Sequence, residues 1–496
     1  MWAWLLFGAV DFVIRIVALG VVPKRRRAST STAWLLLIFL WPLLGVPLYI
    51  IFGSWWAMGR RLDDDPEASA LVDTILAGSA RPEPTTYDAP GGNDGDAAAL
   101  MRLTGALSGF PDSCGHVVAL HNDTAETFRQ MAASIDRATH HVNALYFQTS
   151  WDECTAPFYE ALERAKARGV TVRLLVDHHG LRTIPGHKAF RRRLDDMGIL
   201  WHKMLPFAPL RGHIRRPDLR NHRKILVVDG REAYIGSHNL VAPDYDTPSF
   251  QKAGITYDDT SVSLTGSIVT QIEAVFALDW YYASREVLTP ADLTPPTTRE
   301  KDTREKEAAD EAPASSMQII PSGPAFRDEP NLRAFVHMVS SARTHVSIAS
   351  PYFIPDEALI AALTNAALSG VEVELFLSEQ FDQFLVGHAQ RSYYGMLLAA
   401  GVRIHLYRKP TMLHSKYVVV DGSLCAIGSS NMDVRSFGLN YEITLVADDA
   451  RLVELLHGND ERNRARSREL TYEEWRDQPW HVHYVDNVCR LWSSLL

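Results

Sequence analysis

Asn221-His222-Arg223-Lys224-Ile225-Leu226-Val227-Val228-Asp229-Gly230 is the stretch that decides the fold, because a second stretch repeats its pattern. The second copy reads Leu413-His414-Ser415-Lys416-Tyr417-Val418-Val419-Val420-Asp421-Gly422. Both copies have the spacing His-x-Lys-x4-Asp, and both continue to a Gly-Ser-x-Asn tetrad, at 236–239 and 428–431. The offset between matched positions is constant, since 414 − 222 and 431 − 239 both give 192. The repeat predicts two similar halves that bring His222 and His414 together.

Each motif places an imidazole and an ammonium group beside an apolar run. Side chains two residues apart share one face of a strand, so each His-Lys pair is expected at the mouth of a buried strand. Histidine can act as a nucleophile or a general acid near neutral pH, and lysine binds phosphoryl oxygens. The serine and asparagine of each tetrad can donate further hydrogen bonds. The pattern therefore predicts a site that handles a phosphate group.

The candidate residues follow from the two motifs. The catalytic set is His222, Lys224, Asp229, His414, Lys416 and Asp421. The phosphate-binding set is Ser237, Asn239, Ser429 and Asn431. Although Asp229 and Asp421 belong to the motif, their position five residues beyond the lysines favours holding the following turn over a part in the chemistry.

These motifs resemble the signature of the phospholipase D superfamily, and the wider sequence resembles the bacterial cardiolipin synthases of that superfamily. The matching stretches are Leu219–Ile225, Ser350-Pro351-Tyr352-Phe353-Ile354-Pro355-Asp356, Gly428–Phe437 and Leu439-Asn440-Tyr441-Glu442. The sequence departs from the family pattern in two places. His238 stands where the first tetrad usually has a second glycine, and Asp258 stands where an arginine is usual in Tyr257-Asp258-Asp259-Thr260.

The resemblance implies phosphatidyl transfer between two phosphatidylglycerol molecules, giving cardiolipin and glycerol through a phosphohistidine intermediate. It implies His222 as the nucleophile and His414 as the general acid/base, although the residues alone do not assign these roles. By the same analogy the histidine-orienting acids cross between the halves: Glu442 serves His222, and Asp259 (or Asp258) serves His414. No cofactor is expected. With two lysines, and no carboxylate cluster beside the motifs, no metal is expected either.

Three other functions fit part of the pattern. A phospholipase D-type hydrolase would have the same residues at the site and use water as acceptor, so the acceptor (a second phosphatidylglycerol, phosphatidylethanolamine or water) stays open. A nuclease is disfavoured by the net charge of −9, and no nucleic-acid partner is expected. A catalytically inactive membrane adaptor would have no need for two intact His-Lys pairs.

Two apolar runs at the N-terminus, Trp2–Val22 and Ala33–Phe52, are each about the 20 residues that cross a bilayer. They predict a multi-pass protein of the cell membrane whose partners are membrane phospholipids. Asp11 and Arg15 lie four apart and can pair on one helix face, which also leaves open an amphipathic helix at the interface. Lys24-Arg25-Arg26-Arg27 favours a cytoplasmic loop, but Arg60 and Arg61 oppose it, so the side of the membrane stays open.

The remaining chain alternates strands and helices, which is typical of a largely parallel α/β sheet. We expect two phospholipase D-like α-β-α sandwich domains packed as a pseudo-twofold pair. The predicted parts are a transmembrane anchor at 1–60, a tether at 61–112, a first domain at 113–293, a disordered linker at 294–316 and a second domain at 317–496. Helices are expected at 125–138, 156–168, 187–197, 331–342 and 357–369, and strands at 141–147, 170–177, 345–350 and 371–377.

Several other features have a plain structural interpretation. The basic cluster before the first motif could draw anionic headgroups or be a solvated loop; its residues are Arg211, His213, Arg215, Arg216, Arg220 and Arg223. The aromatic runs Trp280-Tyr281-Tyr282 and Tyr393-Tyr394 are expected in helix cores. The four cysteines are dispersed along the chain and are expected to be core thiols.

Overall fold

The computed structural model of the chain describes residues 2–24, 28–54, 59, 61–77, 95–207, 216–245, 247–294 and 314–491. The chain divides into two compact parts, residues 1–61 with 205–219 and residues 62–204 with 220–496. We call the second part the body and describe each part by itself. The residues outside the described ranges include half of the basic cluster (at 211–215), residues 25–27 of the basic loop and most of the expected linker (295–313).

The N-terminal part is helical, with α1 (Trp2–Val21), α2 (Ala28–Leu40), α3 (Pro42–Leu48) and a π-helical turn, η1 (Tyr49–Gly53). Asp11 and Arg15 pair on α1 at 2.8 Å, as their spacing predicts. The expected second span is divided at Trp41, whose φ of −138° is not helical, because Pro42 disfavours the helical conformation in the residue before it. Within the described chain, no helix combines the length and hydropathy needed to cross a bilayer, which differs from the two spans expected.

The stretch expected to be a tether contains ordered helices of the body. They are η3 (Leu62–Asp64), α4 (Pro66–Leu76) and α5 (Asp96–Ser108). Glu67 of α4 accepts a hydrogen bond from the Tyr281 hydroxyl, and Gln318 donates to the carbonyls of Met101, in the middle of α5, and of Phe110, just after it. The sequence predicted a tether here because the stretch is polar overall, although α4 and α5 each bury an apolar face. Residues 78–94, with most of the Gly and Pro, lie outside the described residues.

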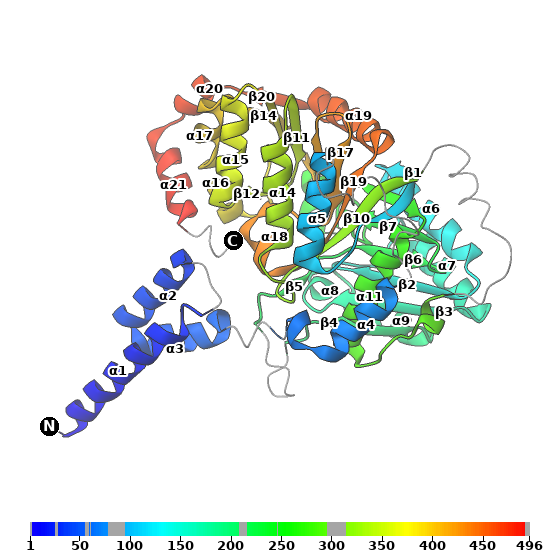
Figure 1. The fold of residues 1–496 in the computed structure, drawn as a ribbon, viewed down its shortest axis with the longest axis horizontal. Helices are drawn as coiled ribbons and strands as arrows, with labels where there is room; N and C mark the ends of the chain where they lie inside the picture. The colour runs from blue at the N-terminus through cyan, green and yellow to red at the C-terminus, as the bar shows by residue number, and fades with distance from the viewer. Residues whose placement is uncertain are drawn as a thin grey trace. The chain divides into compact units, whose positions relative to one another are not determined.

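The first half of the body carries the first motif (Figure 1). Its elements are β1 (Ser113–His121), α6 (Thr124–Arg137), β2 (His141–Tyr146), α7 (Ala156–Ala167), β3 (Thr171–Asp177), α8 (Gly180–Thr183), α9 (His187–Asp196), β4 (Leu200–Met204), β5 (Arg220–Asn221), β6 (Ile225–Val228), β7 (Glu232–Gly236), α10 (Pro248–Ala253), β8 (Thr256–Asp258), β9 (Ser261–Thr265), α11 (Ile268–Ser284) and α12 (Pro290–Leu293).

The second half carries the second motif and a longer C-terminal tail of helices. Its elements are β10 (Ser315–Ser322), α14 (Pro330–Ser341), β11 (His345–Ala349), β12 (Phe353–Ile354), α15 (Glu357–Leu368), β13 (Glu372–Ser378), α16 (Phe384–Arg391), α17 (Tyr394–Ala399), β14 (Arg403–Tyr407), β15 (Thr411–Leu413), β16 (Tyr417–Val420), β17 (Leu424–Gly428), β18 (Met432–Asp433), α18 (Val434–Gly438), β19 (Asn440–Asp448), α19 (Ala450–Arg466), β20 (Ser467–Leu470), α20 (Tyr472–Arg476) and α21 (Trp480–Arg490).

One sheet joins the two halves, with helices on both of its faces (Figure 1). Its strand order is β20-β14-β13-β11-β16-β17-β19-β10-β1-β9-β7-β6-β2-β3-β4. From the central β10–β1 pair outward, each half passes through a matching series of strands: β19, β17, β16, β11, β13 and β14 on one side, and β9, β7, β6, β2, β3 and β4 on the other. The body is therefore an α/β fold in which the strands after the two motifs, β6 and β16, occupy equivalent places.

The periodic segments agree with their predictions to within a few residues, as α6, α7, α9, α14, α15, β2, β3, β11 and β13 show. The expected largely parallel sheet was wrong. Along the main strand order, the parallel pairs are β2/β3, β3/β4, β11/β13 and β13/β14, and the strands near the centre pair antiparallel with one another; the short β5, off this order, pairs in parallel with β19. The cause is local: Asp229 and Gly230 have φ of 53° and 63°, so they form a tight turn that makes β6 and β7 a hairpin.

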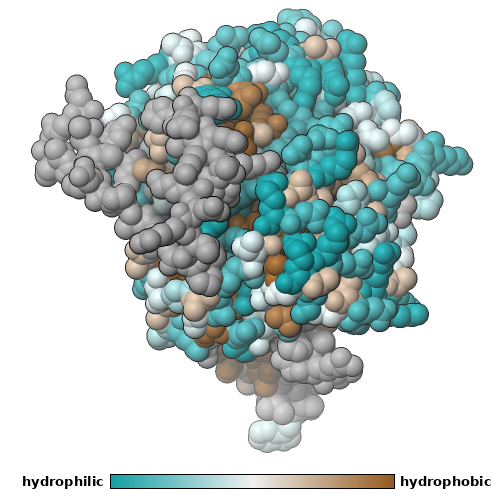
Figure 2. Space-filling view, turned by 90° about the vertical axis from the view of Figure 1, so that its right-hand side faces the viewer, coloured by the Kyte–Doolittle hydropathy of each residue, from teal (hydrophilic) through white to brown (hydrophobic). Residues whose placement is uncertain are grey.

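Each half buries its own apolar core. Phe128, Phe158 and Leu174 are fully buried in the first half, as are Leu363 and Leu375 in the second. The face in Figure 2, which lies on the side of the body away from α21, is mostly hydrophilic and has only small hydrophobic patches.

The aromatic runs expected in helix cores are largely buried. Trp280 and Tyr281 are buried on α11, and Tyr393 and Tyr394 are buried at the start of α17. The expectation of core positions is confirmed for these four residues.

Candidate active site

A short strand before each motif crosses to the other half. β5 pairs in parallel with β19, Asn221 opposite Tyr441, and β15 pairs in parallel with β8, Leu413 opposite Asp258. The residue after each partner is an acid, Glu442 and Asp259. Because each motif begins where its short strand ends, each histidine emerges beside a carboxylate of the opposite half.

His222 is fixed at its backbone and at one ring nitrogen. The backbone N–H of His222 donates to the Tyr441 carbonyl at 2.9 Å. Its Nδ1 lies 3.0 and 3.1 Å from the two Glu442 oxygens and 3.1 Å from the Ser429 carbonyl oxygen. The Phe147 ring packs edge-on against the imidazole, with 5.1 Å between centroids. With Nδ1 facing acceptors, Nε2 is the nitrogen available for chemistry.

His414 has the corresponding environment in the second half. Its N–H donates to the Asp258 carbonyl at 2.8 Å, and its Nδ1 lies 2.6 Å from Asp259 Oδ1. The Tyr257 ring packs edge-on against the imidazole at 5.1 Å. Here too a carboxylate accepts at Nδ1 and leaves Nε2 for the reacting group.

The two lysines turn back toward their own histidines. Lys224 Nζ donates to the His222 carbonyl at 2.6 Å, and Lys416 Nζ donates to the His414 carbonyl at 2.5 Å. Neither His-x-Lys segment belongs to a strand, since β6 begins at Ile225 and β16 at Tyr417, so the expectation of one strand face was wrong. An ammonium group has three donors, which leaves two on each lysine for phosphoryl oxygens.

The ionisable groups of the two halves act on one another. Burial lowers the pKa of Lys416 to about 8 and that of Lys224 well below its usual value, and the positive charge of Lys416 lowers the Lys224 pKa further. Lys416 likewise lowers the pKa of His222, and Lys224 lowers that of His414. Such mutual effects require short separations in a poorly solvated site. The two motifs therefore form a single electrostatic site.

The histidines are neutral and the carboxylates ionised at neutral pH. Burial lowers the pKa of His414 to about 4 and also lowers that of His222, against the attraction of the neighbouring acids. Burial by itself would raise the pKa of Asp259 and Glu442, but the adjacent histidine and lysine charges outweigh it and hold both values below the usual range. A bound phosphodiester anion would favour protonation of the neighbouring imidazoles and lysines, because it adds negative charge beside them.

The serines and the asparagines of the two tetrads make different contacts. Ser429 Oγ donates to Glu442 at 2.5 Å, and Ser237 Oγ bonds the backbone of Thr260 beside Asp259. Both serines thus hold the acid-bearing strands, and their expected part in binding phosphate stays a prediction. Asn239 donates to the Tyr245 hydroxyl at 2.9 Å. Asn431 is buried, and its Oδ1 has no hydrogen-bond partner among the described residues.

The motif aspartates lie at the far end of the strands from the histidines. Asp229 accepts from the backbone N–H groups of residues 139–141, just before and at the start of β2. Asp421 does the same for residues 343–345 at β11. Their carboxylates tie each hairpin turn to the neighbouring strand of the sheet. They lie away from the proposed phosphate site, and they hold more than their own turn. Listing them with the catalytic groups was therefore wrong.

Sequence reasoning missed Arg223, which it placed in the basic cluster. Its side chain is fully buried; it donates to Asp279 at 2.7 Å and to the Glu442 carbonyl at 3.0 Å. Asn221 donates to the same Asp279 oxygen at 2.9 Å. Strand alternation could not have separated Arg223 from the other arginines of the basic cluster, because residues 222–224 do not belong to a strand.

The comparisons with known proteins cover the whole chain. The family model described as cardiolipin synthase, PLD-like domain, matches residues 131–280 and 335–461, and the model described as phospholipase D-nuclease N-terminal matches residues 13–54. A cardiolipin synthase of Halalkalibacterium halodurans is 31% identical over 100% of this chain and 95% of its own length. The chain belongs to the cardiolipin synthases of the phospholipase D superfamily.

Further matches agree with this family. A cardiolipin synthase A of Proteus mirabilis is 30% identical over 100% of this chain and 98% of its own length. The crystal structure of a phosphatidylserine synthase of Haemophilus influenzae has a TM-score of 0.58 at 14% identity, covering 81% of this chain and all of that one, which shows a shared fold.

The two departures from the cardiolipin synthase pattern lie outside the reacting groups. The His238 ring is buried, with Nδ1 2.8 Å from Ser261 Oγ and Phe128 packed edge-on at 6.3 Å. Asp258 accepts from the Tyr407 hydroxyl at 2.6 Å and pairs with Arg462 and Arg466 of α19. Its backbone carbonyl, not its side chain, is the atom that positions His414. The departures therefore leave the two imidazole–carboxylate pairs intact.

Proposed function

We propose that this enzyme transfers a phosphatidyl group from one phosphatidylglycerol to another, forming cardiolipin and releasing glycerol. The observation that carries the proposal is the crossed pairing, in which Glu442 holds His222 and Asp259 holds His414. It leaves two Nε2 atoms in one site between two lysines. Membership of the cardiolipin synthase family supports the same phosphatidyltransferase activity and supplies the lipid substrate class.

In the first step, His222 Nε2 attacks the phosphorus of a phosphatidylglycerol. The N–P bond forms, and the bond from phosphorus to the headgroup glycerol oxygen breaks. The protonated His414 gives its Nε2 proton to that oxygen, so glycerol leaves neutral. The close contact between Asp259 and His414 suits the ring that carries a proton, because the carboxylate stabilises the imidazolium. The family resemblance supports the same assignment of roles.

In the second step, neutral His414 takes the proton from a hydroxyl of a second phosphatidylglycerol. The hydroxyl oxygen attacks phosphorus, the N–P bond breaks, and His222 returns to its neutral form. Lys224 and Lys416 each retain two donors for the non-bridging oxygens, on which negative charge builds in both transition states. Asn239 and Asn431, one from each tetrad, are proposed to add amide donors to the same oxygens.

We further propose that the halves form a pseudo-twofold pair, as the matching series of strands around β10 and β1 supports. A twofold arrangement accounts for the crossing of the acids, since each half then supplies an acid to the other's histidine. The N-terminal part is proposed to attach the enzyme to the membrane, in line with the family model that matches residues 13–54. Protection of single cysteines introduced into this part from a water-soluble cysteine reagent in sealed vesicles would distinguish crossing from surface attachment.

The deciding experiment uses purified full-length enzyme in detergent with phosphatidylglycerol as the only lipid. The expected products are cardiolipin and glycerol in equal amounts. Phosphatidic acid without cardiolipin would instead establish the hydrolase. The double variant His222→Ala/His414→Ala is the matched control and should form neither product.

A further inference from the structure

The exposed apolar side chains of the body are concentrated on one group of helices. Twelve large hydrophobic residues of the described body are exposed, and eight of them lie on α16, α17, α20 and α21 or directly after α21. The first half, by contrast, exposes only Leu200 and Val287 among its described residues. An apolar concentration of this kind marks an interaction surface rather than ordinary scatter.

Helix α21 carries a regular stripe. Trp480, Tyr484, Val488 and Leu491 are spaced by four, four and three residues, so they share one face of the helix. Trp480 is 78% exposed, Tyr484 63% and Leu491 79%. The opposite face is packed, since Asp486 and Cys489 are buried. The exposure of the stripe therefore does not result from a loosely packed helix.

Helix α16 extends this surface with Phe384 and Leu385, which are 68% and 44% exposed. Asp486 of α21 pairs with His388 of α16 at 2.6 Å and with Arg391 at 3.3 Å, which fixes the two helices together (Figure 1). We call Phe384, Leu385, Trp480, Tyr484, Val488 and Leu491 the α16–α21 patch.

The α16 end of the patch lies close to the active site. Asp382, two residues before Phe384, accepts from the Tyr352 hydroxyl at 2.9 Å and from the Tyr257 hydroxyl at 3.5 Å. Tyr257 is the residue whose ring packs against His414. Asp382 and Tyr257 therefore connect the α16 end of the patch to His414.

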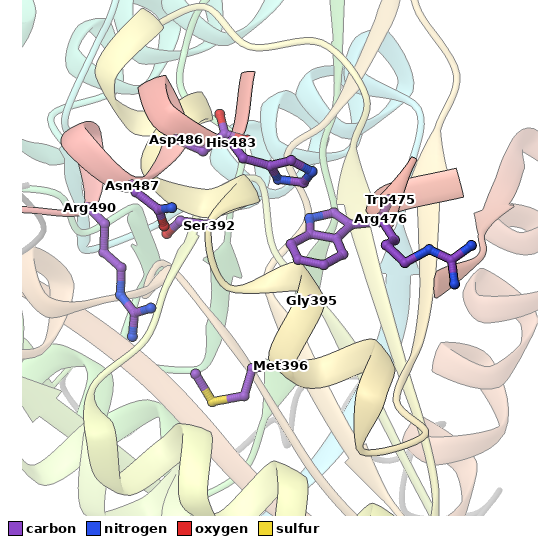
Figure 3. Close-up of a pocket in the computed structure, with 9 residues that line it drawn as sticks. All are labelled: Ser392, Gly395, Met396, Trp475, Arg476, His483, Asp486, Asn487 and Arg490. Carbon is purple, nitrogen blue, oxygen red and sulfur yellow. The ribbon is translucent and has the colours of Figure 1, made fainter. Parts of the chain in front are cut away.

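Cationic side chains accompany the stripe. The neighbouring side of α21 lines a cavity of about 430 Å³ with His483, Asn487 and Arg490, and Trp475 and Arg476 of α20 also line it (Figure 3). The guanidinium carbon of Arg490 lies 4.7 Å from the centre of the Tyr393 ring, so a cation–π contact holds this side chain at the cavity wall. Exposed tryptophan and tyrosine beside arginine is the composition that favours a membrane–water interface with anionic lipids.

We propose that the α16–α21 patch rests on an anionic phospholipid bilayer and holds the second half of the body on the lipid surface. The proposal rests on the proposed function, because an enzyme that joins two bilayer lipids must keep its site at the bilayer during both steps. The stripe enters the interface, and the cavity beside it receives a phosphate headgroup. The patch then acts in addition to the N-terminal part.

The first experiment compares full-length enzyme in phosphatidylglycerol vesicles with the same enzyme on a short-chain, water-dispersed phosphatidylglycerol. The triple variant Trp480→Ala/Tyr484→Ala/Leu491→Ala should lose about tenfold or more in kcat/KM on vesicles and stay within about twofold on the dispersed substrate. Leu368→Ala, which removes a 72% exposed side chain from α15, is the matched control and should be unchanged on both. Unchanged activity of the triple variant on vesicles, or equal loss on both substrates, would overturn the proposal.

The second experiment needs no catalysis, so it stands even if the enzyme makes no cardiolipin. p-Benzoylphenylalanine is placed at Tyr484 or, as control, at Leu368 in full-length protein reconstituted with radiolabelled phosphatidylglycerol. Illumination should attach lipid at position 484 about tenfold more than at position 368. Equal labelling at both positions would refute the patch. Crosslinking of position 484 to a second copy of the chain would assign the surface to self-association instead.

Discussion

The two motifs have the same backbone pairing but differ in the side chains that support it. In the first half, Arg223 is buried against Asp279, and the His222 ring meets both Glu442 and the Ser429 carbonyl. In the second half, Ser415 occupies the place of Arg223 and bonds Thr260 at 2.9 Å. Duplication preserved the crossing strands, while the surroundings diverged. A duplicated fold can thus give two identical residues different surroundings.

The largest expected effects on cardiolipin formation come from replacing each histidine in turn. His222→Ala should lower cardiolipin formation by about 10⁴-fold or more, and His414→Ala by about 10²–10⁴-fold, because only the first forms the covalent bond. The assay is product formation from phosphatidylglycerol in detergent.

A substrate with an activated leaving group separates the two roles. With a nitrophenyl phosphatidyl ester, which needs no proton to depart, His414→Ala should release one equivalent of nitrophenol per enzyme and then stop. His222→Ala should release none. A burst from His222→Ala and none from His414→Ala would reverse the assignment of nucleophile and acid.

The orienting acids provide a second comparison. Asp259→Asn and Glu442→Gln should each lower kcat by roughly 10²–10⁴-fold, since a carboxylate fixes the tautomer and stabilises the imidazolium. The effect should be larger for Asp259→Asn. The Ser429 carbonyl still accepts from His222 Nδ1 when Glu442 is changed, whereas Asp259 is the acceptor found at His414 Nδ1 among the described residues. Equal losses would show that the Ser429 carbonyl does not support the ring.

The residues between His and Lys test stability rather than chemistry. Arg223→Met leaves Asp279 as an uncompensated buried charge and should lower the free energy of unfolding by about 3–5 kcal/mol. Ser415→Ala removes hydrogen bonds between neutral groups and should cost about 1 kcal/mol. Urea unfolding in detergent, followed by circular dichroism, measures both. A smaller loss for Arg223→Met than for Ser415→Ala would contradict the bracing assigned to the first half.

Low pH should lower the free energy of unfolding because of the buried His414. Burial lowers its pKa from 6.5 to about 4, so between these values the unfolded chain binds the proton and the folded protein does not. The free energy of unfolding therefore falls as the pH drops from 6.5 toward 4, by up to about 3 kcal/mol from this residue. The urea midpoint of His414→Asn should depend less steeply on pH over that window than that of the wild type. An unchanged slope would place the titration elsewhere.

Much of the fold was predictable because local patterns were consistent with it. Helices such as α6 and α15 follow from apolar periodicity and from Asp caps at Asp123 and Asp356. The Asp-Gly turns that make β6/β7 and β16/β17 hairpins were visible in the sequence but were outweighed by the strand–helix alternation. The helices within the expected tether were missed because the partners of α4 and α5, helices α11 and α14, are distant in the chain.

The sequence by itself determined the chemical groups, their duplication and the constant offset of 192 residues, because these are properties of residue order. Only the tertiary structure decided which groups meet. The serines turn to the acid-bearing strands, the motif aspartates lie at the far ends of β6 and β16, and Arg223 points into the core. These placements arise from contacts between residues that are 13, 88 and 56 positions apart in the chain, and the spacing of the motifs carries no information about such contacts.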